Sequence, residues 1–391
     1  MKKHFAFVNV PAAGHVNPTL PLVGELLRRG HRVSYAVGRK MAPAVLDTGA
    51  DLVELPTEVP KLGRGDQMSP QHVKRMVDFV CDDLRASYPL LREHFQDDPP
   101  DAVCADMMAP HGRMLAEELG LPAIVLMPSM ASNEQFSLRE SGAGGNQESA
   151  AELFVEMHAR ISEVATALGV RPMMPFQPDS GDLNLVFLPR EFQPAGETFD
   201  ERYHFIGPLL GERDQQPWQP RDPHAPLLYI ALGTAFNDRP AFYRLCLAAF
   251  ADSPWQVAMS TGPDVDLADL GAVPGNFDVR ASFPQPAVLR HASAFVSHTG
   301  MNSTMESLHA GVPLVAVPQM TEQAINAGRV EELGLGRRLD PAALTAEQLR
   351  AAVDEVAADT GIRANLERMR EVIRSCGGAV AGADALENHL A

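Results

Sequence analysis

The stretch HFAFVNVPAAGHVNPTLPLVGELLRRGHRVSYAVG (residues 4–38) decides the fold. An apolar run of the kind found in buried strands stands near each end of it, at 4–10 and at 31–38. Between these runs Asn17 is a good N-cap and Pro18 a good first helical residue, and a glycine follows the last apolar position, so we predict a helix. A strand, a helix and a second strand form a parallel pair with a right-handed crossover.

The same alternation continues along the chain. We predict further strands at 101–108, 122–129 and 182–189, with a mostly helical insertion at 133–175. After a Pro-rich polar segment the strands resume in PLLYIALGT, WQVAMSTG, FDVRASF, SAFVSHTG and PLVAVP. Two alternating blocks joined by such a linker predict two doubly wound α/β domains. Ligands of such sheets bind beyond the carboxyl ends of the strands, so we expect the site in an interdomain cleft.

The composition supports two soluble domains. A length of 391 residues exceeds the size at which single hydrophobic cores stop growing. Hydrophobic residues make up 45% of the chain and charged residues 21%, as in ordinary soluble proteins. The net charge of 33 − 50 = −17 argues against a nucleic-acid partner, because phosphate binding needs clustered Lys and Arg.

The sequence also predicts where the protein is found. It has no apolar run of about 18 residues, so we expect no membrane span and no stable membrane association. The start, MKKHFAFVNVPAAGH, reads as a buried strand and not as a signal peptide, and we expect a cytoplasmic protein. Four cysteines without CxxC or CxxH spacing are expected to be reduced thiols: Cys81, Cys104, Cys246 and Cys376. The sequence does not indicate the oligomeric state.

A candidate anion site lies in VSHTGMNSTMESLHAG (residues 296–311). We expect a strand to end near Ser297 and a helix to begin near Ser303, and the unpaired amides and positive dipole of a helix N-terminus suit a phosphate. Two interpretations of Glu306 stay open, because Ser303 and Glu306 also fit a capping box that serves only the helix. His298 is either a structural histidine or a ligand contact.

Further motifs turn this block into a family resemblance. Together with SFPQPAVL (282–289) and VPQMTEQ (317–323), it resembles the donor-binding signature of the family 1 glycosyltransferases, the UDP-glycosyltransferase superfamily. PAAGHVNPTLPLVGELLRRGHRVSYA and LGTAFNDRPAFY resemble the bacterial macrolide glycosyltransferase branch. The resemblance covers nearly the whole chain and is weakest at 133–180, where this family contacts the acceptor.

The resemblance implies the GT-B fold, in which two Rossmann-like domains face each other across a cleft. We accordingly expect an N-terminal acceptor domain at 1–207, a linker at 208–226 and a C-terminal nucleotide-sugar domain at 227–375. A C-terminal helix at 376–391 is expected to pack back toward the N-terminal domain. The implied activity is UDP-dependent O-glycosyl transfer, in which a hexose, most simply glucose, moves with inversion to a hydroxyl group of a large apolar small molecule.

The resemblance also implies the residues that hold the donor. Glu306 would accept hydrogen bonds from the ribose, and Glu322 with Gln323 would bind the sugar hydroxyls, although Glu322 also fits a helix cap. The plant enzymes place a uracil-stacking tryptophan where this chain has Ser282, so uridine and thymidine both stay open. The expected nucleotide and diphosphate contacts are Thr234, Ser282, Phe283, Gln285, His298, Gly300, Asn302, Ser303, Thr304 and Glu306.

Two residues of the N-terminal block are candidates for catalysis. His15 follows the first strand, where ligands meet such sheets, and a histidine can take a proton from a hydroxyl near neutral pH. Asp106 ends another strand of the same domain and could hold one ring nitrogen of His15, as in a catalytic triad. Each residue alone also fits a turn or a cap, but together they match the His-Asp pair of the family. Gly14 is expected to allow an unusual backbone angle.

The acceptor pocket and the cofactors are predicted less directly. The tentative pocket residues are Met76, Phe79, Met107, Met130 and Phe136, although methionines at helical spacing also form plain core. Macrolides, flavonoids and other phenolics would suit such a lining. Because the sequence has no HExxH, DxD or Cys/His cluster, we expect no metal and no cofactor besides the UDP-sugar co-substrate. Three alternatives are a nucleotide-sugar epimerase, a non-catalytic sugar-nucleotide-binding protein and a membrane-docked lipid glycosyltransferase.

Overall fold

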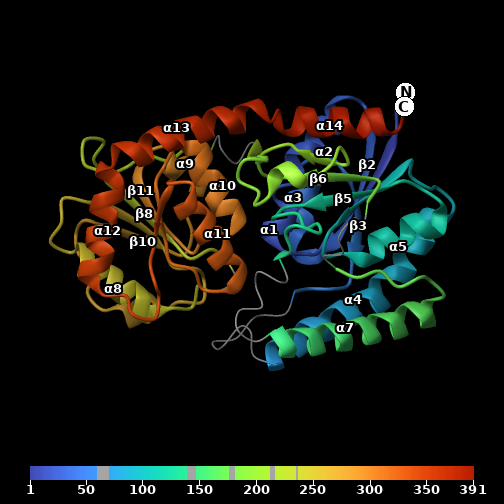
Figure 1. The fold of residues 1–391 in the computed structure, drawn as a ribbon, viewed down its shortest axis with the longest axis horizontal. Coiled ribbons are helices and arrows are strands. Elements are labelled where there is room, and N and C mark those ends of the chain that lie inside the picture. Colours follow the sequence, from blue (N-terminus) through green and yellow to red (C-terminus); the bar gives the residue numbers. More distant parts are fainter. Residues whose placement is uncertain (60–69, 139–146, 176–180, 212–215, 235–236) are drawn as a thin grey trace. The chain divides into compact units, whose positions relative to one another are not determined.

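The computed structural model divides into two compact units (Figure 1). Unit 1 ends at Leu209 and resumes at Cys376, and unit 2 runs from Leu210 to Ser375. Parts of the predicted acceptor region and of the predicted linker, namely 139–146, 176–180 and 212–215, lie outside the described residues. The structure describes residues 1–59, 70–138, 147–175, 181–211, 216–234 and 237–391.

Unit 1 is built on a parallel sheet of seven strands in the order β3-β2-β1-β4-β5-β6-β7. Its elements in chain order are β1 (His4–Val8), α1 (Ala13–Val16), α2 (Leu20–Arg28), β2 (Arg32–Gly38), η1 (Arg39–Met41), α3 (Ala42–Leu46), β3 (Asp51–Leu55), α4 (Pro70–Gln96), β4 (Ala102–Asp106), α5 (Pro110–Leu119), β5 (Ala123–Met127), α7 (Gln147–Leu168), β6 (Leu183–Val186), η2 (Gly196–Thr198), β7 (Tyr203–Phe205) and α14 (Gly378–His389).

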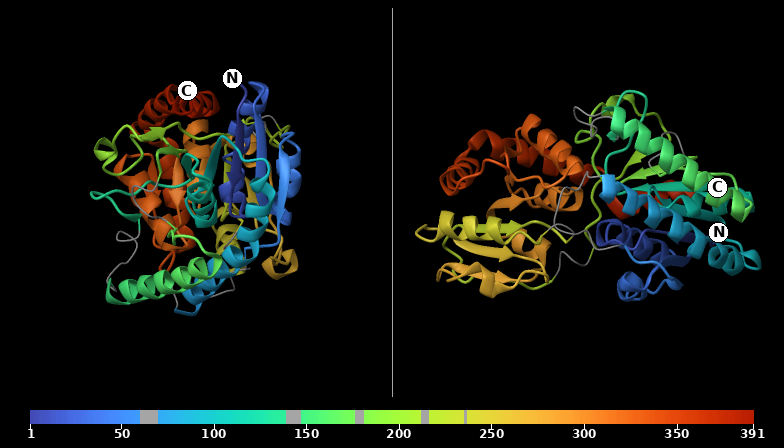
Figure 2. Two further views of the ribbon diagram at one scale, coloured as in Figure 1. Left: turned by 90° about the vertical axis from the view of Figure 1, so that its right-hand side faces the viewer. Right: turned by 90° about the horizontal axis from the view of Figure 1, so that it is seen from below.

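Both faces of this sheet are buried, because the strand residues alternate between two apolar clusters. In β1, Phe5 and Phe7 pack with α2 and α14, whereas Ala6 and Val8 pack with α4, α5 and α7. Figure 2 shows the helices covering the two faces of the sheet. This double burial explains why every residue of β1 is inaccessible and why the sequence there reads as a continuous apolar run.

The C-terminal helix α14 belongs to unit 1, beside α2 (Figure 1). Leu386 of α14 joins the same apolar cluster as Leu22 and Leu26 of α2. At the edge of this contact, Arg29 Nη1 lies 2.7 Å from Asp384 Oδ1 and 2.5 Å from Glu387 Oε2. The last residues of the chain therefore complete the core that the first residues begin.

Unit 2 repeats the design with a parallel sheet of six strands in the order β10-β9-β8-β11-β12-β13. Its elements are β8 (Leu227–Ala231), α8 (Pro240–Phe250), β9 (Gln256–Ser260), η4 (Leu267–Leu270), β10 (Phe277–Arg280), α9 (Gln285–Leu289), β11 (Ala292–Ser297), α10 (Met301–Ala310), β12 (Leu314–Ala316), α11 (Thr321–Glu332), β13 (Gly336–Arg338), α12 (Ala346–Ala358) and α13 (Thr360–Ser375).

Each sheet has one point where the strand order reverses direction. In unit 1 it lies between β1 and β4, and in unit 2 between β8 and β11. Helices leave the two central strands toward opposite faces there, which opens a crevice beyond the carboxyl ends of these strands. The predicted doubly wound architecture is confirmed, with one such reversal point in the described sheet of each unit.

Several local predictions were wrong. The helix predicted to begin at Pro18 begins at Leu20, because a separate short helix, α1, ends at Val16 and Asn17 is its C-cap. Gly14 is not among the glycines with positive φ, since it lies inside α1. The predictions also omitted three short strands, β3, β7 and β13.

None of the helices in the described part of the chain is both long and apolar enough to cross a membrane. Even α4, with 27 residues, carries Lys, Arg and Asp side chains along its length. Its apolar side instead covers one face of the sheet in unit 1.

Replacing Leu386 with Ala tests whether α14 is part of the core of unit 1. Leu386 is fully buried, so Leu386→Ala should lower the free energy of unfolding of this unit by about 2–5 kcal/mol. The matched control is Val380→Ala, because Val380 lies on the same helix with 52% of its surface exposed. Urea unfolding followed by circular dichroism measures both variants, and equal stability of the two would show that α14 is not part of the core.

Candidate active site

One candidate site lies in unit 1, where His15 and Asp106 meet. His15 belongs to α1, directly after β1, and Asp106 is the last residue of β4. These two strands flank the reversal point of the sheet, so their carboxyl ends bring the side chains together. His15 Nδ1 lies 2.7 Å from Asp106 Oδ2. The structure therefore joins two residues that are 91 positions apart in the sequence.

The geometry of this pair orients the imidazole. Asp106 is fully buried, and its second oxygen, Oδ1, accepts a hydrogen bond from the backbone amide of Met108 at 2.8 Å. The carboxylate is thus held on both sides and accepts the proton on His15 Nδ1. In this tautomer Nε2 is the ring nitrogen that can accept a proton, and the side chain of His15 keeps 22% of its surface exposed. A substrate hydroxyl group can reach such a nitrogen.

A second candidate site lies in unit 2, at the start of α10. This helix begins at Met301 after the N-cap residue Gly300, which provides no side-chain cap. The capping-box interpretation of Ser303 and Glu306 is therefore wrong, because Ser303 already lies within the first turn. The first amides of a helix have no partner in the helix, so the backbone at 301–303 offers donors to an anion.

Glu306 is instead bound by a side chain from a neighbouring helix. Gln285, at the start of α9, donates from Nε2 to Glu306 Oε2 at 2.7 Å and to Ser303 Oγ at 3.0 Å. Three residues predicted to contact the nucleotide are thus brought together. Thr304 is placed poorly for that role, because it is fully buried and its amide donates to the Gly300 carbonyl at 3.0 Å.

His298 follows β11 and is packed between two glycines. A Cβ atom on either Gly233 or Gly300 would lie 2.5 Å from His298 Nε2, so neither position can carry a side chain. Burial lowers the pKa of His298 to about 4, and the backbone of Ala231 opposes this shift only in part. His298 is therefore neutral at physiological pH. It acts as a hydrogen-bonding group and not as a permanent positive charge.

The residue after His298 was not predicted to have a special role. Thr299 has φ 60, a left-handed conformation that is uncommon for a residue other than glycine. It is fully buried, and Asn326 of α11 donates from Nδ2 to the Thr299 carbonyl at 2.9 Å. Its hydroxyl lies 3.0 Å from the carbonyl of Gln323. These hydrogen bonds connect the turn before α10 to the N-terminal half of α11.

The other residues predicted to bind the donor lie on loops, in the case of Thr234 and Ser282, or in the first turns of α10 and α11, in the case of Asn302, Glu322 and Gln323. Thr234 and Ser282 are exposed, and Asn302 and Glu322 are half-buried. The oxygen Oε1 of Gln323 already accepts from the amide of Gln319 at 2.8 Å, which fixes the orientation of this side-chain amide.

Phe283, the aromatic residue nearest to the expected base position, is enclosed by three side chains of unit 2. The rings of Trp218 and Tyr229 meet it edge-on, with centroids 6.3 Å and 6.2 Å away. The guanidinium of Arg280 lies 4.9 Å from its centroid. Phe283 therefore has a fixed position beside Ser282, although the rings around it come from distant parts of the sequence.

The predicted acceptor residues divide by exposure. Met130 is fully buried and Met107 is 5% exposed, so both belong to the core and are removed from the pocket. Met76, Phe79 and Phe136 are half-buried and can contribute to a surface. Methionine pattern alone could not make this distinction, because core and pocket use the same residue type.

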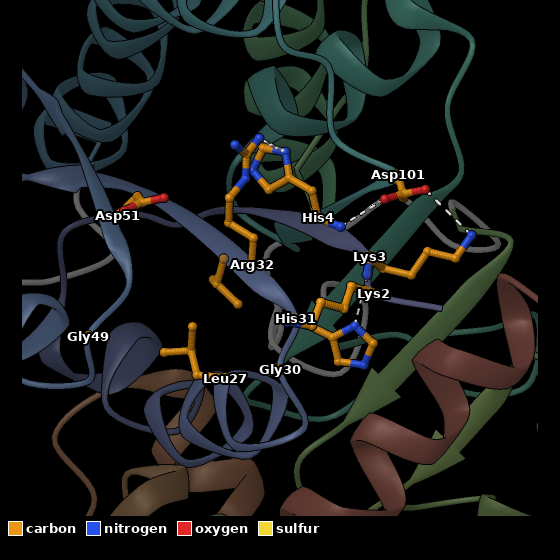
Figure 3. A pocket seen from close by; sticks show the side chains of 11 residues that line it. Lys2, Lys3, His4, Leu27, Gly30, His31, Arg32, Gly49, Asp51 and Asp101 are labelled. Atoms are coloured by element: carbon orange, nitrogen blue, oxygen red, sulfur yellow. Dashed lines mark hydrogen bonds and ion pairs between the residues drawn. The ribbon is translucent and has the colours of Figure 1, made fainter.

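A pocket of about 480 Å³ lies elsewhere in unit 1 (Figure 3). It opens at the amino ends of the strands, the edge opposite to His15 and Asp106. Most of its polar side chains already have partners: Lys3 Nζ lies 3.4 Å from Asp101 Oδ1, and Arg32 Nη2 lies 2.6 Å from His4 Nδ1. This pocket is therefore separate from the candidate active site. Within the described residues, no three His, Cys, Asp or Glu side chains are grouped as metal ligands.

Comparisons with known proteins show which proteins the chain resembles. Residues 256–377, which include α10 and α11, match the family model described as Erythromycin biosynthesis protein CIII-like, C-terminal domain. The chain is 39% identical over 404 residues to the NDP-glycosyltransferase YjiC of Bacillus licheniformis, an alignment that covers 100% of this chain and 98% of that protein. It is 37% identical over 400 residues to the demethyllactenocin mycarosyltransferase of Streptomyces fradiae, covering 99% and 86% of the two chains.

A solved structure is similar over the same length. The calicheamicin glycosyltransferase CalG4 superposes with a TM-score of 0.82 and 36% sequence identity, covering 100% of this chain and 98% of the other. The resemblance therefore extends through both units.

The buried, neutral His298 predicts a pH dependence of stability. The unfolded chain binds a proton at this residue below about pH 6.5, whereas the folded protein does so only near pH 4. Stability linked to His298 is thus fully present above pH 6.5 and is lost as the pH falls toward 4, by roughly 3 kcal/mol. Asparagine does not titrate, so the stability of His298→Asn does not change through this residue. The difference in free energy of unfolding between wild type and variant should therefore shrink as the pH falls from 6.5 toward 4. Urea unfolding of both proteins at pH 7 and at pH 4.5 measures it, and a constant difference would contradict burial as the cause.

Proposed function

This chain belongs to the family 1 glycosyltransferases and has their GT-B fold, and we propose that it transfers a hexose from a UDP-sugar, with inversion, to a hydroxyl group of a large apolar small molecule. The observation that carries the proposal is the contact between His15 and Asp106 at the reversal point of the sheet in unit 1. A buried carboxylate that orients an accessible imidazole is the arrangement expected of a general base.

The reaction uses Nε2 of His15, the ring nitrogen on the side away from Asp106. The acceptor hydroxyl donates its proton to Nε2 while its oxygen attacks the anomeric carbon of the donor sugar. The bond between that carbon and the diphosphate breaks in the same step, so the configuration inverts. Asp106 stabilises the imidazolium that forms, because its carboxylate lies 2.7 Å from Nδ1.

The departing nucleoside diphosphate is stabilised in unit 2. The amides at the start of α10 and the positive end of its dipole face the developing charge. His298 adds a hydrogen bond from a buried, neutral ring. Gly233 and Gly300 allow the diphosphate to approach the backbone, since neither can carry a side chain here. We propose that no metal ion is required for this step.

Two observations support the proposed substrates. Gln285 and Glu306 form a polar pair suited to ribose, which offers two vicinal hydroxyl groups where the deoxyribose of thymidine offers one. The name of the demethyllactenocin mycarosyltransferase points to a macrolide acceptor for that relative. By analogy we propose a macrolide, flavonoid or other polyketide or phenolic acceptor, with Met76, Phe79 and Phe136 on its binding surface and glucose as the transferred sugar.

The variant His15→Ala tests the proposed base. Turnover should fall by about two to four orders of magnitude, the usual contribution of general-base catalysis, while UDP binding stays unchanged because the diphosphate site is in unit 2. Asp106→Asn should behave similarly but more mildly. The matched control is His158→Ala, since His158 is an exposed histidine of α7.

The assay incubates the protein with UDP- and TDP-sugars and with macrolide and phenolic acceptors, and reads products by mass. Calorimetric titration of UDP gives the donor affinity. Near-normal turnover of His15→Ala would remove His15 from the mechanism. A sugar isomerised without any acceptor would identify an epimerase and contradict the proposed function.

Exhaustive chelation tests the proposed leaving-group stabilisation. Turnover should survive dialysis against EDTA, because in this proposal the helix amides and His298 stabilise the negative charge of the leaving diphosphate, which a metal ion would otherwise do. The measurement compares initial rates before dialysis, after dialysis and after addition of Mg²⁺ or Mn²⁺. Loss of transfer on chelation with recovery on adding metal would show that the amides of α10 do not suffice.

A further inference from the structure

The short helix α1, which carries His15, has little intrinsic stability. It spans only four residues, one of them Gly14, and its N-cap residue Ala12 provides no side-chain hydrogen bond. Isolated helices of this length do not form in water. The position of the His15 backbone must therefore be fixed by contacts with the rest of unit 1. Asp106 holds only the ring, so other residues must hold the main chain.

Two buried side chains hold the carbonyl groups of α1. Asn9 donates from Nδ2 to the carbonyl of His15 at 3.3 Å. Thr19 donates from Oγ1 to the carbonyl of Val16 at 2.8 Å. Asn9 is 1% exposed and Thr19 is inaccessible, so water does not compete for these bonds. Carbonyl groups that the helix itself leaves unpaired are thereby satisfied.

Tyr35 of β2 joins these two side chains. Its hydroxyl oxygen lies 2.6 Å from Asn9 Nδ2 and 2.6 Å from Thr19 Oγ1. Because the single hydrogen of Thr19 goes to Val16, Tyr35 must donate to Thr19 and accept from Asn9. The direction of every hydrogen bond in this network is thus determined. Burial raises the pKa of Tyr35 above its ordinary value, so the phenol stays protonated.

The ring of Tyr35 cannot move away from this position. It is fully buried and stacks on Phe7 of β1, with centroids 5.6 Å apart and an angle of 15° between the rings. The other amide atom of Asn9, Oδ1, is buried without a partner, so only Tyr35 and His15 fix the orientation of this amide. The hydroxyl group of Tyr35 is therefore the centre of the network.

We propose that Tyr35 is a positioning residue for the reaction, which acts through Asn9 and Thr19 to hold α1 and hence the nitrogen Nε2 of His15. This inference rests on the proposed function, in which His15 is the base. Asp106 fixes the ring at Nδ1, and the network fixes the main chain of the same residue. Both constraints are needed, because a shift of about 1 Å in a reacting group can lower a rate by about a hundredfold.

The variant Tyr35→Phe tests the inference, since it removes the hydroxyl group and keeps the stacked ring. We expect kcat to fall about ten- to a hundredfold while KM for the donor changes less than about twofold. The matched control is Tyr88→Phe. Tyr88 is also a fully buried tyrosine of unit 1, and its hydroxyl donates to Glu118, away from α1. This control should keep the wild-type kcat.

A double-variant cycle separates positioning from general destabilisation. If Tyr35 acts through His15, adding Tyr35→Phe to His15→Ala should leave the residual turnover unchanged. A further fall of the same factor as in the single variant would show that Tyr35 acts independently of His15 and would overturn the inference.

A second pair of variants keeps the test decisive if Tyr35→Phe does not fold. Thr19→Val removes the hydroxyl group that accepts the hydrogen bond from Tyr35, so it should lower kcat. Thr19→Ser keeps a hydroxyl group at this position and should have nearly the wild-type kcat. Equal turnover of these two variants would overturn the inference. If His15→Ala itself keeps its turnover, the proposed function fails. If His15→Ala is inactive and Tyr35→Phe has the wild-type kcat, only the positioning role fails.

Discussion

The reversal of strand order in each parallel sheet determines where the candidate site residues of that unit lie. Parallel strands all end at the same edge, so residues that follow them gather there whatever their distance in the sequence. His15 and Asp106 follow β1 and β4, the neighbouring strands on either side of the reversal in unit 1. In unit 2, Gly233 and His298 follow β8 and β11 in the same way. One topological rule thus gathers the candidate site residues of each unit at the carboxyl edge of its sheet.

The same rule explains how much could be predicted from the sequence. The pairing of His15 with Asp106 was predictable, because both residues directly follow apolar strands. The start of α10 was not predictable in this way, because Ser303 and Glu306 fit a capping box. In the structure the N-cap residue is Gly300, so Ser303 lies inside the helix and the capping box does not form. The low pKa of His298 depends on burial, and the network around Tyr35 joins β1, β2 and the loop before α2. Sequence patterns describe neither burial nor contacts between distant side chains.

The two histidines at these edges show how the environment sets the role of one residue type. His15 keeps part of its ring accessible and has a buried carboxylate on its other nitrogen, which suits a group that gains and loses a proton. His298 is enclosed between two glycines, where burial keeps the ring uncharged. The same residue type is thus placed in an environment that allows charging in one unit and in an environment that opposes it in the other.

The return of the chain to unit 1 has a consequence for synthesis on the ribosome. Because α14 comes from the last residues, the face of the sheet around Leu22 and Leu26 has no cover from it while residues 210–375 of unit 2 are being made. That stretch of unit 2 is continuous in sequence and can fold as soon as it emerges, whereas unit 1, which begins first, finishes last. A nascent chain therefore carries an apolar surface until α14 has been made, and a chain that stops before α14 would be prone to aggregation.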